Sequence, residues 1–173
     1  MYKRQINDNW TYYAPDRNHK TPAELIRIFC DIITMGGNLL LNVGPKPDGT
    51  IDKPETEGLL ALGAFIEKNQ EAIYNTRRGL DWRFYSGGSV FSQDRRTLYL
   101  FVHDIPRQGI MIKGIDNEII SANILSTGEP LRTHYYFGRG YGCFWIHLNQ
   151  EQADPDTTTA VSYTHLDVYK RQL

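Results

Sequence analysis

Residues 36–51 read GGNLLLNVGPKPDGTI and place a short apolar run between two turns. The run Asn38–Val43 carries three consecutive leucines without alternation, which is typical of a strand buried on both faces of a parallel sheet. The Gly-Pro pair at residues 44–45 ends the run, and the Pro-Asp-Gly-Thr sequence at residues 47–50 has the composition of a tight turn. This stretch therefore predicts one strand of an α/β architecture.

A helix is predicted on each side of this strand. Before it, Thr21 and Glu24 form the residue pair of a capping box, and apolar residues recur at helical spacing from Leu25 to Ile33. After it, Asp52 is a candidate N-cap, and apolar residues recur at helical spacing as far as Ile73. Alternation of helix and strand is the pattern of α/β proteins.

The pattern of apolar and polar residues changes after Tyr74. From Trp82 to Leu148 the chain reads as short alternating runs separated by turn residues, which predicts an antiparallel β-sandwich. The boundary between the two halves is predicted after Arg78, which gives domains over residues 6–78 and 79–160. The candidate strands are Ser89–Ser92, Thr97–His103, Gly109–Ile112, Glu118–Leu125, Leu131–Tyr136 and Cys143–Leu148.

The two ends of the chain share the tetrapeptide YKRQ, at residues 2–5 and 169–172. Residues 161–172 resemble the translation of an inverted transposon end used in sequencing-library adapters. We interpret residues 1–5 and 161–173 as adapter-derived and exclude them from the fold predictions. The natural sequence is then expected to run from Ile6 to Ala160, with both ends of its gene outside it.

Length and composition exclude several classes of protein. A length of 173 residues is too short for a complete (β/α)8 barrel, which needs about 250 residues. A net charge of −1 argues against a strongly basic nucleic-acid-binding protein. No apolar run approaches the roughly 20 residues of a membrane span. Neither nucleic acid nor a membrane is therefore an expected partner.

A search for catalytic and metal-binding motifs finds none. The sequence lacks a nucleophile elbow and a phosphate-binding loop, and the glycine-rich stretch at residues 138–142 reads as a loop. Cys30 and Cys143 read as core thiols. The histidines are scattered without the spacing of metal ligands, at His19, His103, His134 and His147. No metal and no cofactor is therefore predicted.

Two residues remain as candidate substrate-binding residues, Trp10 and Asn42. Asn42 lies at the carboxyl end of the predicted strand, where α/β folds build their sites. It either caps the backbone of the following turn or contacts a ligand. Trp10 belongs to an aromatic loop and either forms an apolar wall for a sugar face or packs at the edge of a barrel. Asp8 and Asp16 share this loop but are not expected to be catalytic.

The chain closely resembles the α-L-fucosidases of glycoside hydrolase family 29 over residues 36–51. Further matches are Glu-Leu-Ile at residues 24–26, Glu-Ala-Ile-Tyr at residues 71–74 and Thr-Arg at residues 76–77. Residues 9–12 resemble the family's Ser-Trp-Gly-Tyr but depart from it at Asn9 and Thr11. The resemblance is specific over residues 7–77, and over residues 80–150 it rests mainly on domain order.

The resemblance implies an α/β plus all-β fold. The C-terminal portion of a (β/α)8 TIM barrel would occupy residues 6–78, and an antiparallel β-sandwich, complete or truncated, would occupy residues 79–160. Asn38–Val43 would be the last barrel strand. Without its barrel neighbours, this strand is expected to leave its backbone edges unpaired.

The family's activity is the retaining, exo-acting hydrolysis of terminal α-L-fucose, so a fucosylated glycan is the expected substrate. Family members place their nucleophilic Asp and acid/base Glu upstream of the motif at residues 9–12. No catalytic residue is therefore expected in this chain, which would be inactive by itself. Family members are often periplasmic, secreted or lysosomal, so localisation stays open, as does the oligomeric state.

A second hypothesis is that the β-rich half is a non-catalytic carbohydrate-binding module. Aromatic side chains can stack on sugar rings, although they more often fill the core of a sandwich. The candidates are Trp82, Phe84, Tyr85, Tyr135, Tyr136, Tyr141 and Trp145.

Overall fold

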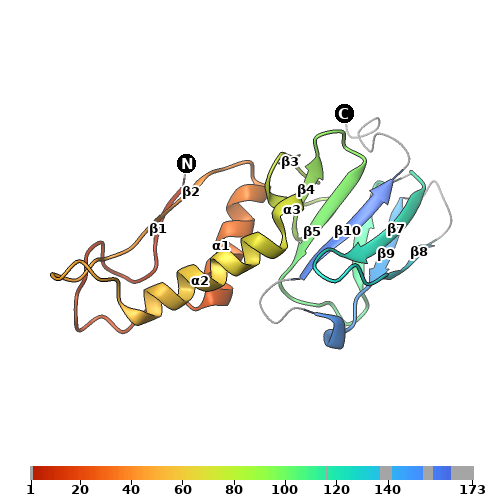
Figure 1. Cartoon of the computed structure of the whole chain (residues 1–173). Coiled ribbons are helices and arrows are strands. Elements are labelled where there is room, and N and C mark those ends of the chain that lie inside the picture. Colours follow the sequence, from red (N-terminus) through yellow and green to blue (C-terminus); the bar gives the residue numbers. More distant parts are fainter. Residues whose placement is uncertain (1, 116, 137–141, 154–157, 165–173) are drawn as a thin grey trace. The chain divides into compact units, whose positions relative to one another are not determined.

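The computed structural model describes residues 2–115, 117–136, 142–153 and 158–164, the last of these as backbone only (Figure 1). The chain divides into an N-terminal unit, residues 1–68, and a C-terminal unit, residues 69–173. Each unit has its own elements and its own buried side chains, so each is described separately. None of the described helices is long and apolar enough to cross a membrane.

The N-terminal unit consists of two parallel strands and two helices. Its elements in chain order are β1 (Tyr2–Gln5), α1 (Pro22–Thr34), β2 (Leu39–Asn42) and α2 (Lys53–Lys68). The helices pack closely, because a Cβ atom on Gly58 of α2 would lie 2.7 Å from Leu25 Cδ1 of α1. The buried apolar side chains of this unit are Ile6, Leu25, Ile26, Cys30, Ile32, Leu62 and Phe65.

The helix predicted after Thr21 is confirmed, together with its capping box. The Glu24 N–H donates to Thr21 Oγ1 over 3.3 Å, and the Thr21 N–H donates to Glu24 Oε2 over 2.7 Å. Two backbone donors of the first turn are thereby satisfied without the rest of the fold. The helix ends before Gly36, whose φ of +73° suits glycine.

Strand β2 confirms the strand predicted over Asn38–Val43 and corrects one expectation about it. It pairs in parallel with β1, in a register that runs from Tyr2 opposite Leu39 to Gln5 opposite Asn42. The expectation that both backbone edges stay unpaired is therefore wrong for the edge beside β1. An edge strand's free N–H and C=O groups accept any extended segment within reach, and residues 2–5 supply one.

The C-terminal unit is all-β apart from a short helix, α3 (Gln70–Ile73), and a 3₁₀ turn, η1 (Gln150–Gln152). One antiparallel sheet has the order β3-β4-β5-β10-β7 and the other has the order β6-β9-β8. The strands are β3 (Thr76–Arg78), β4 (Gly88–Ser92), β5 (Thr97–Val102), β6 (Ile110–Lys113), β7 (Ile119–Ile124), β8 (Arg132–Tyr136), β9 (Cys143–His147) and β10 (Thr158–Thr164).

Both sheets of this unit contribute to one apolar core. Phe91 and Leu100 from the first sheet and Ile112, Phe144 and Ile146 from the second are each at most 1% exposed and belong to the same cluster. The alternation seen in the sequence produces this arrangement, because every second residue of a strand faces the core. The predicted antiparallel β architecture is thus present in the C-terminal unit.

The six strands predicted in this region are all present, and two further strands join them. Strand β3 is short and polar. Strand β10 lies between β5 and β7 and continues past Ala160 to Thr164, into the segment interpreted as adapter-derived. The two compact units divide after Lys68, and β3 pairs with β4 and so groups with the sheets. The domain boundary after Arg78 stays a prediction.

Candidate functional site

The two sequence-predicted binding residues come together at the end of strand β2. Asn42 is the last residue of that strand, and its Nδ2 donates to the carbonyl oxygen of Trp10 over 2.8 Å. The side chain of Asn42 therefore caps the backbone of the aromatic loop, 32 residues earlier in the chain, and not the turn that follows the strand. This bond fixes the loop at the carboxyl end of the strand.

A glycine lets the aromatic loop approach the strand end. A Cβ atom on Gly44 would lie 2.6 Å from the Tyr12 nitrogen and 2.8 Å from the Thr11 carbonyl carbon, both main-chain atoms. The Gly44 N–H faces the carboxylate of Glu55, at 3.4 Å from Oε1 and 3.3 Å from Oε2. Glu55 is only 2% exposed.

Gly44 and Glu55 are parts of this arrangement that the sequence predictions did not identify as such. Glu55 reads in sequence as an acidic residue in the first turn of a helix, a common position for a carboxylate. The Gly44 N–H that donates to it lies 11 residues earlier in the chain, and this contact is not visible in any local pattern. The Gly-Pro pair at residues 44–45 was a usable signal, since a glycine there marks a close backbone approach.

The aromatic residues Trp10 and Tyr13 of the loop are exposed. Trp10 is 61% exposed, and Tyr13 is 56% exposed. The Lys3 Nζ lies 3.1 Å from the centre of the Trp10 ring, a cation–π contact. Lys3 belongs to the segment interpreted as adapter-derived. The loop thus holds its backbone in place while presenting a large aromatic surface to solvent.

The acidic residues of the loop hold it together. Asp16 accepts hydrogen bonds from Asn9 Nδ2 over 2.8 Å and from the Asn18 N–H over 2.9 Å, and Asp8 Oδ2 accepts from Asn18 Nδ2 over 2.8 Å. The bonds from Asn18 and Asn9 hold the pKa of Asp16 below its usual value. These contacts give both aspartates a structural role in the loop.

The turn after β2 is organised in the same way. Asp48 accepts from the N–H and the hydroxyl of Thr50 over 3.0 and 2.7 Å, which lowers the pKa of Asp48. Lys46 forms an ion pair with Asp52 over 2.8 Å, and this contact raises the pKa of Lys46. The segment between β2 and α2 is therefore fixed by local polar contacts.

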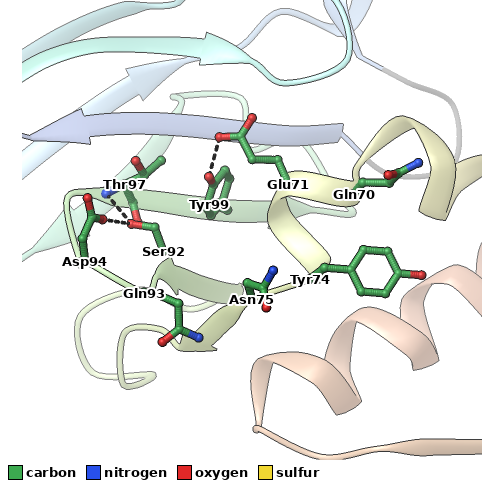
Figure 2. Close-up of a pocket in the computed structure, with 9 residues that line it drawn as sticks. All are labelled: Gln70, Glu71, Tyr74, Asn75, Ser92, Gln93, Asp94, Thr97 and Tyr99. Atoms are coloured by element: carbon green, nitrogen blue, oxygen red, sulfur yellow. Dashed lines mark hydrogen bonds between the residues drawn. The ribbon is translucent and has the colours of Figure 1, made fainter.

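A second candidate site is a pocket in the C-terminal unit, with a volume of about 630 Å³. It lies between α3 and the hairpin of β4 and β5 (Figure 2). This is within the range of small-molecule pockets, about 300–1,000 Å³. Its lining is polar, and it consists of Gln70, Glu71, Tyr74, Asn75, Ser92, Gln93, Asp94, Thr97 and Tyr99.

The described residues do not gather three His, Cys, Asp or Glu side chains in the way that a metal site requires. His134 and His147 form a pair across β8 and β9, with 2.9 Å between His134 Nδ1 and His147 Nε2. Burial raises the pKa of the Cys30 thiol, which suits a core residue.

The aromatic residues proposed for the carbohydrate-binding module have different environments. Trp82 and Tyr136 are 79% and 54% exposed, whereas Tyr85 is 6% exposed. Phe84 and Tyr135 pack against the core. Trp145 stacks with His134, with 6.3 Å between their ring centres. Tyr141 lies outside the described residues.

Comparison with known proteins finds similarity to the α-L-fucosidases. A family model described as Alpha-L-fucosidase matches residues 2–71. The plasma α-L-fucosidase of Homo sapiens is 30% identical over 155 residues, which make up 82% of this chain and 30% of the human protein. The chain is related to the α-L-fucosidases. It spans less than a third of the length of the curated relatives that it matches.

Solved α-L-fucosidase structures share the fold of the chain. Isoenzyme 1 of Paenibacillus thiaminolyticus superposes with a TM-score of 0.80 at 23% identity, over 95% of this chain and 39% of that one. The Thermotoga maritima α-fucosidase in complex with fucose gives a TM-score of 0.72 at 27% identity, over 92% of this chain and 38% of that one. The structural similarity thus extends over both units, whereas the family model covers the first unit and only residues 69–71 of the second.

The fucosidase match includes the motifs on which the sequence resemblance was based. Residues 36–51 form strand β2 and the turn after it, and residues 9–12 form the loop bound by Asn42. A further motif, Glu-Ala-Ile-Tyr at residues 71–74, spans most of α3 and its C-cap, and its Glu71 and Tyr74 line the pocket.

Proposed function

We propose that this chain is the C-terminal portion of an exo-acting, retaining α-L-fucosidase that removes terminal α-L-fucose from glycoconjugates. The observation that carries the proposal is the hydrogen bond from Asn42 to Trp10, which fixes an exposed aromatic loop at the carboxyl end of a parallel strand. Active sites of α/β barrels are built at that end of their strands.

In this proposal residues 6–78 are the last strand of a (β/α)8 barrel with its two flanking helices. The order α1, β2, α2 in the N-terminal unit supports this arrangement. Residues 79–160 are a C-terminal β-sandwich, which the shared core of the two antiparallel sheets supports.

The catalytic carboxyl groups of the enzyme lie outside this chain in our proposal. Retaining glycosidases use a nucleophilic carboxylate and an acid/base carboxyl group about 5–5.5 Å apart. The family pattern puts both upstream of the loop at residues 9–12. Asp8 and Asp16 are engaged in hydrogen bonds within the loop, which supports leaving them out of these roles. The chain alone would therefore not hydrolyse fucosides.

The roles of the two binding residues differ. The exposed ring of Trp10 would pack against the apolar face of a fucosyl residue, because an aromatic face suits the C–H groups of a sugar ring. Asn42 would act as a positioning residue, since its amide is used to hold the Trp10 backbone. The substrate in this proposal is a fucosylated glycan.

A test requires the longer protein, obtained by extending the coding sequence upstream of Ile6. The proposal expects it to hydrolyse 4-nitrophenyl α-L-fucoside and to leave the matching β-D-galactoside and α-D-glucoside intact. Replacing Trp10 by Ala should lower kcat/KM about tenfold, equivalent to about 1.4 kcal/mol.

Tyr13 provides a matched control, because it is an exposed aromatic residue of the same loop. Tyr13→Ala should change kcat/KM less than about twofold if Trp10 alone contacts the sugar. A folded longer protein without fucosidase activity would overturn the proposed function. Equal effects of the two substitutions would overturn the role of Trp10 only.

A further inference from the structure

The pocket of the C-terminal unit has no part in the proposed hydrolysis. It is formed by the first residues of α3, by Tyr74 and Asn75 directly after that helix, and by the hairpin of β4 and β5, all within residues 69–173. Two of its wall residues, Glu71 and Tyr74, belong to the Glu-Ala-Ile-Tyr motif that the sequence resemblance singled out. The proposed active-site loop gives this motif no role.

Hydrogen bonds hold the carboxylates of the pocket in place. The Tyr99 hydroxyl donates to Glu71 Oε1 over 2.5 Å, and Tyr99 itself is 2% exposed. Figure 2 shows the Glu71 carboxylate above the Tyr99 ring. On the hairpin, the Ser92 hydroxyl donates to Asp94 Oδ1 over 2.6 Å, and the Thr97 N–H donates to Ser92 Oγ over 3.0 Å.

Each carboxylate uses one oxygen in these bonds. Asp94 Oδ1 also accepts from the Arg96 N–H over 3.1 Å, and these bonds lower the pKa of Asp94. Within the described residues, Glu71 Oε2 and Asp94 Oδ2 accept no hydrogen bond. Two fixed carboxyl oxygens therefore remain available to a ligand that donates hydrogen bonds.

Amide groups complete the pocket. The side chain of Asn75 lies between α3 and the hairpin in Figure 2, and no hydrogen bond of its amide to another described residue is recorded. Its φ of +54° is the left-handed conformation that asparagine adopts at helix C-termini. Gln70 adds a second amide from the helix, and Tyr74, 59% exposed, stands at the rim.

This lining disfavours both anions and tightly held metal ions. The lining includes two carboxylates and no basic side chain, and these carboxylates disfavour an anion. Arg77 lies beside the lining and donates to Gln93 Oε1 over 2.7 Å. A tightly held metal ion would need a third acidic or histidine ligand, and the described residues gather no such group of three. The pocket offers carboxyl oxygens, which accept hydrogen bonds, beside amide groups, which both donate and accept them. These groups match an uncharged molecule rich in hydroxyl groups.

We propose that this pocket is a second, non-catalytic binding site for a neutral pyranose, such as a terminal sugar of a glycan. The hydroxyl groups of the sugar donate to Glu71 Oε2 and Asp94 Oδ2 and exchange hydrogen bonds with the Asn75 amide. Binding at this pocket does not depend on the fucosidase activity. In a longer enzyme such a site would hold a glycan on the protein independently of the active site.

The test uses the full chain and saturation-transfer-difference NMR with methyl α-L-fucopyranoside and methyl β-D-galactopyranoside. At least one of the two should bind with a millimolar dissociation constant. Asn75→Gly removes the amide and keeps the left-handed backbone, and Glu71→Gln removes one acceptor charge. Each should weaken binding about tenfold, while Trp82→Ala, a control at an exposed aromatic of the same unit outside the lining, leaves it unchanged.

Three outcomes would overturn the proposal. The first is the absence of binding by either sugar up to about 50 mM, well above the millimolar affinity expected of so small a ligand. The second is binding lost in Trp10→Ala and kept in Asn75→Gly, which would place the sugar at the aromatic loop. The third is binding of CaCl₂ that Glu71→Gln abolishes, with no sugar binding. A longer protein without fucosidase activity that still binds sugar here would overturn the proposed function and support the pocket.

Discussion

Replacing Gly44 by Ala tests how the aromatic loop is held at the end of β2. The new methyl group would lie 2.6 Å from the Tyr12 nitrogen and 2.8 Å from the Thr11 carbonyl carbon. Both atoms belong to the main chain, so no side-chain rotation relieves the overlap. Either the loop moves away from the strand end, or the Gly44 N–H moves away from the buried carboxylate of Glu55.

The size of the effect follows from these two contacts. Overpacking a tight site costs about 1–3 kcal/mol, and weakening a buried hydrogen bond to a charged group costs a similar amount. We expect the free energy of local opening to fall by about 2 kcal/mol, which corresponds to about 30-fold faster amide exchange. Hydrogen–deuterium exchange of the peptides that contain residues 10–13 and the start of α2 measures this directly.

Gly63→Ala is the matched control. Gly63 lies inside α2, and a Cβ atom there would meet nothing within 4 Å. This substitution should stabilise the helix by about 0.5–1 kcal/mol, because alanine has the higher helix propensity. Unchanged exchange of residues 10–13 in Gly44→Ala would refute the reasoning, as would equal effects of the two substitutions.

Three further predictions concern single contacts. Asn42→Ala should speed amide exchange of the aromatic loop about fivefold, because it removes one hydrogen bond worth about 1 kcal/mol. An unchanged exchange rate would contradict the role of the Asn42–Trp10 hydrogen bond in holding the loop. The Thr21 bonds lower the pKa of Glu24 from its ordinary 4.5, so protection of the first turn of α1 should be full above pH 4.5 and be lost as the pH falls below it. Thr21→Ala should remove that pH dependence, and a dependence that persists would contradict the capping box. Iodoacetamide should label Cys143, which is partly exposed, and spare Cys30, which is buried, until the chain unfolds; equal labelling of the folded chain would contradict the burial.

Local signals in the sequence predicted most of the elements. The capping box of Thr21 and Glu24 marks the start of α1 because its hydrogen bonds join residues three apart. Alternation of apolar and polar residues predicted six strands of the C-terminal unit to within two residues. These patterns arise within a single element, so they can be read before its partners are known.

Contacts between distant segments were not predictable in this way. The bond from Asn42 to Trp10 joins residues 32 apart, and its direction, toward the loop instead of the next turn, depends on where the loop lies. The hydrogen bond from the Gly44 N–H to Glu55 likewise joins separate elements. Strand β10 lies between β5 and β7 and pairs with both. Its position in the sheet therefore depends on strands far from it in the sequence.

The most direct test of the fucosidase proposal is the initial rate of 4-nitrophenol release from 4-nitrophenyl α-L-fucoside. It should be measured for the chain alone and for the longer protein extended upstream of Ile6, both purified and folded. We predict activity only in the longer protein, because the nucleophile and the acid/base are proposed to lie upstream. Hydrolysis by the chain alone at a comparable rate, or none by the folded longer protein, would contradict this account.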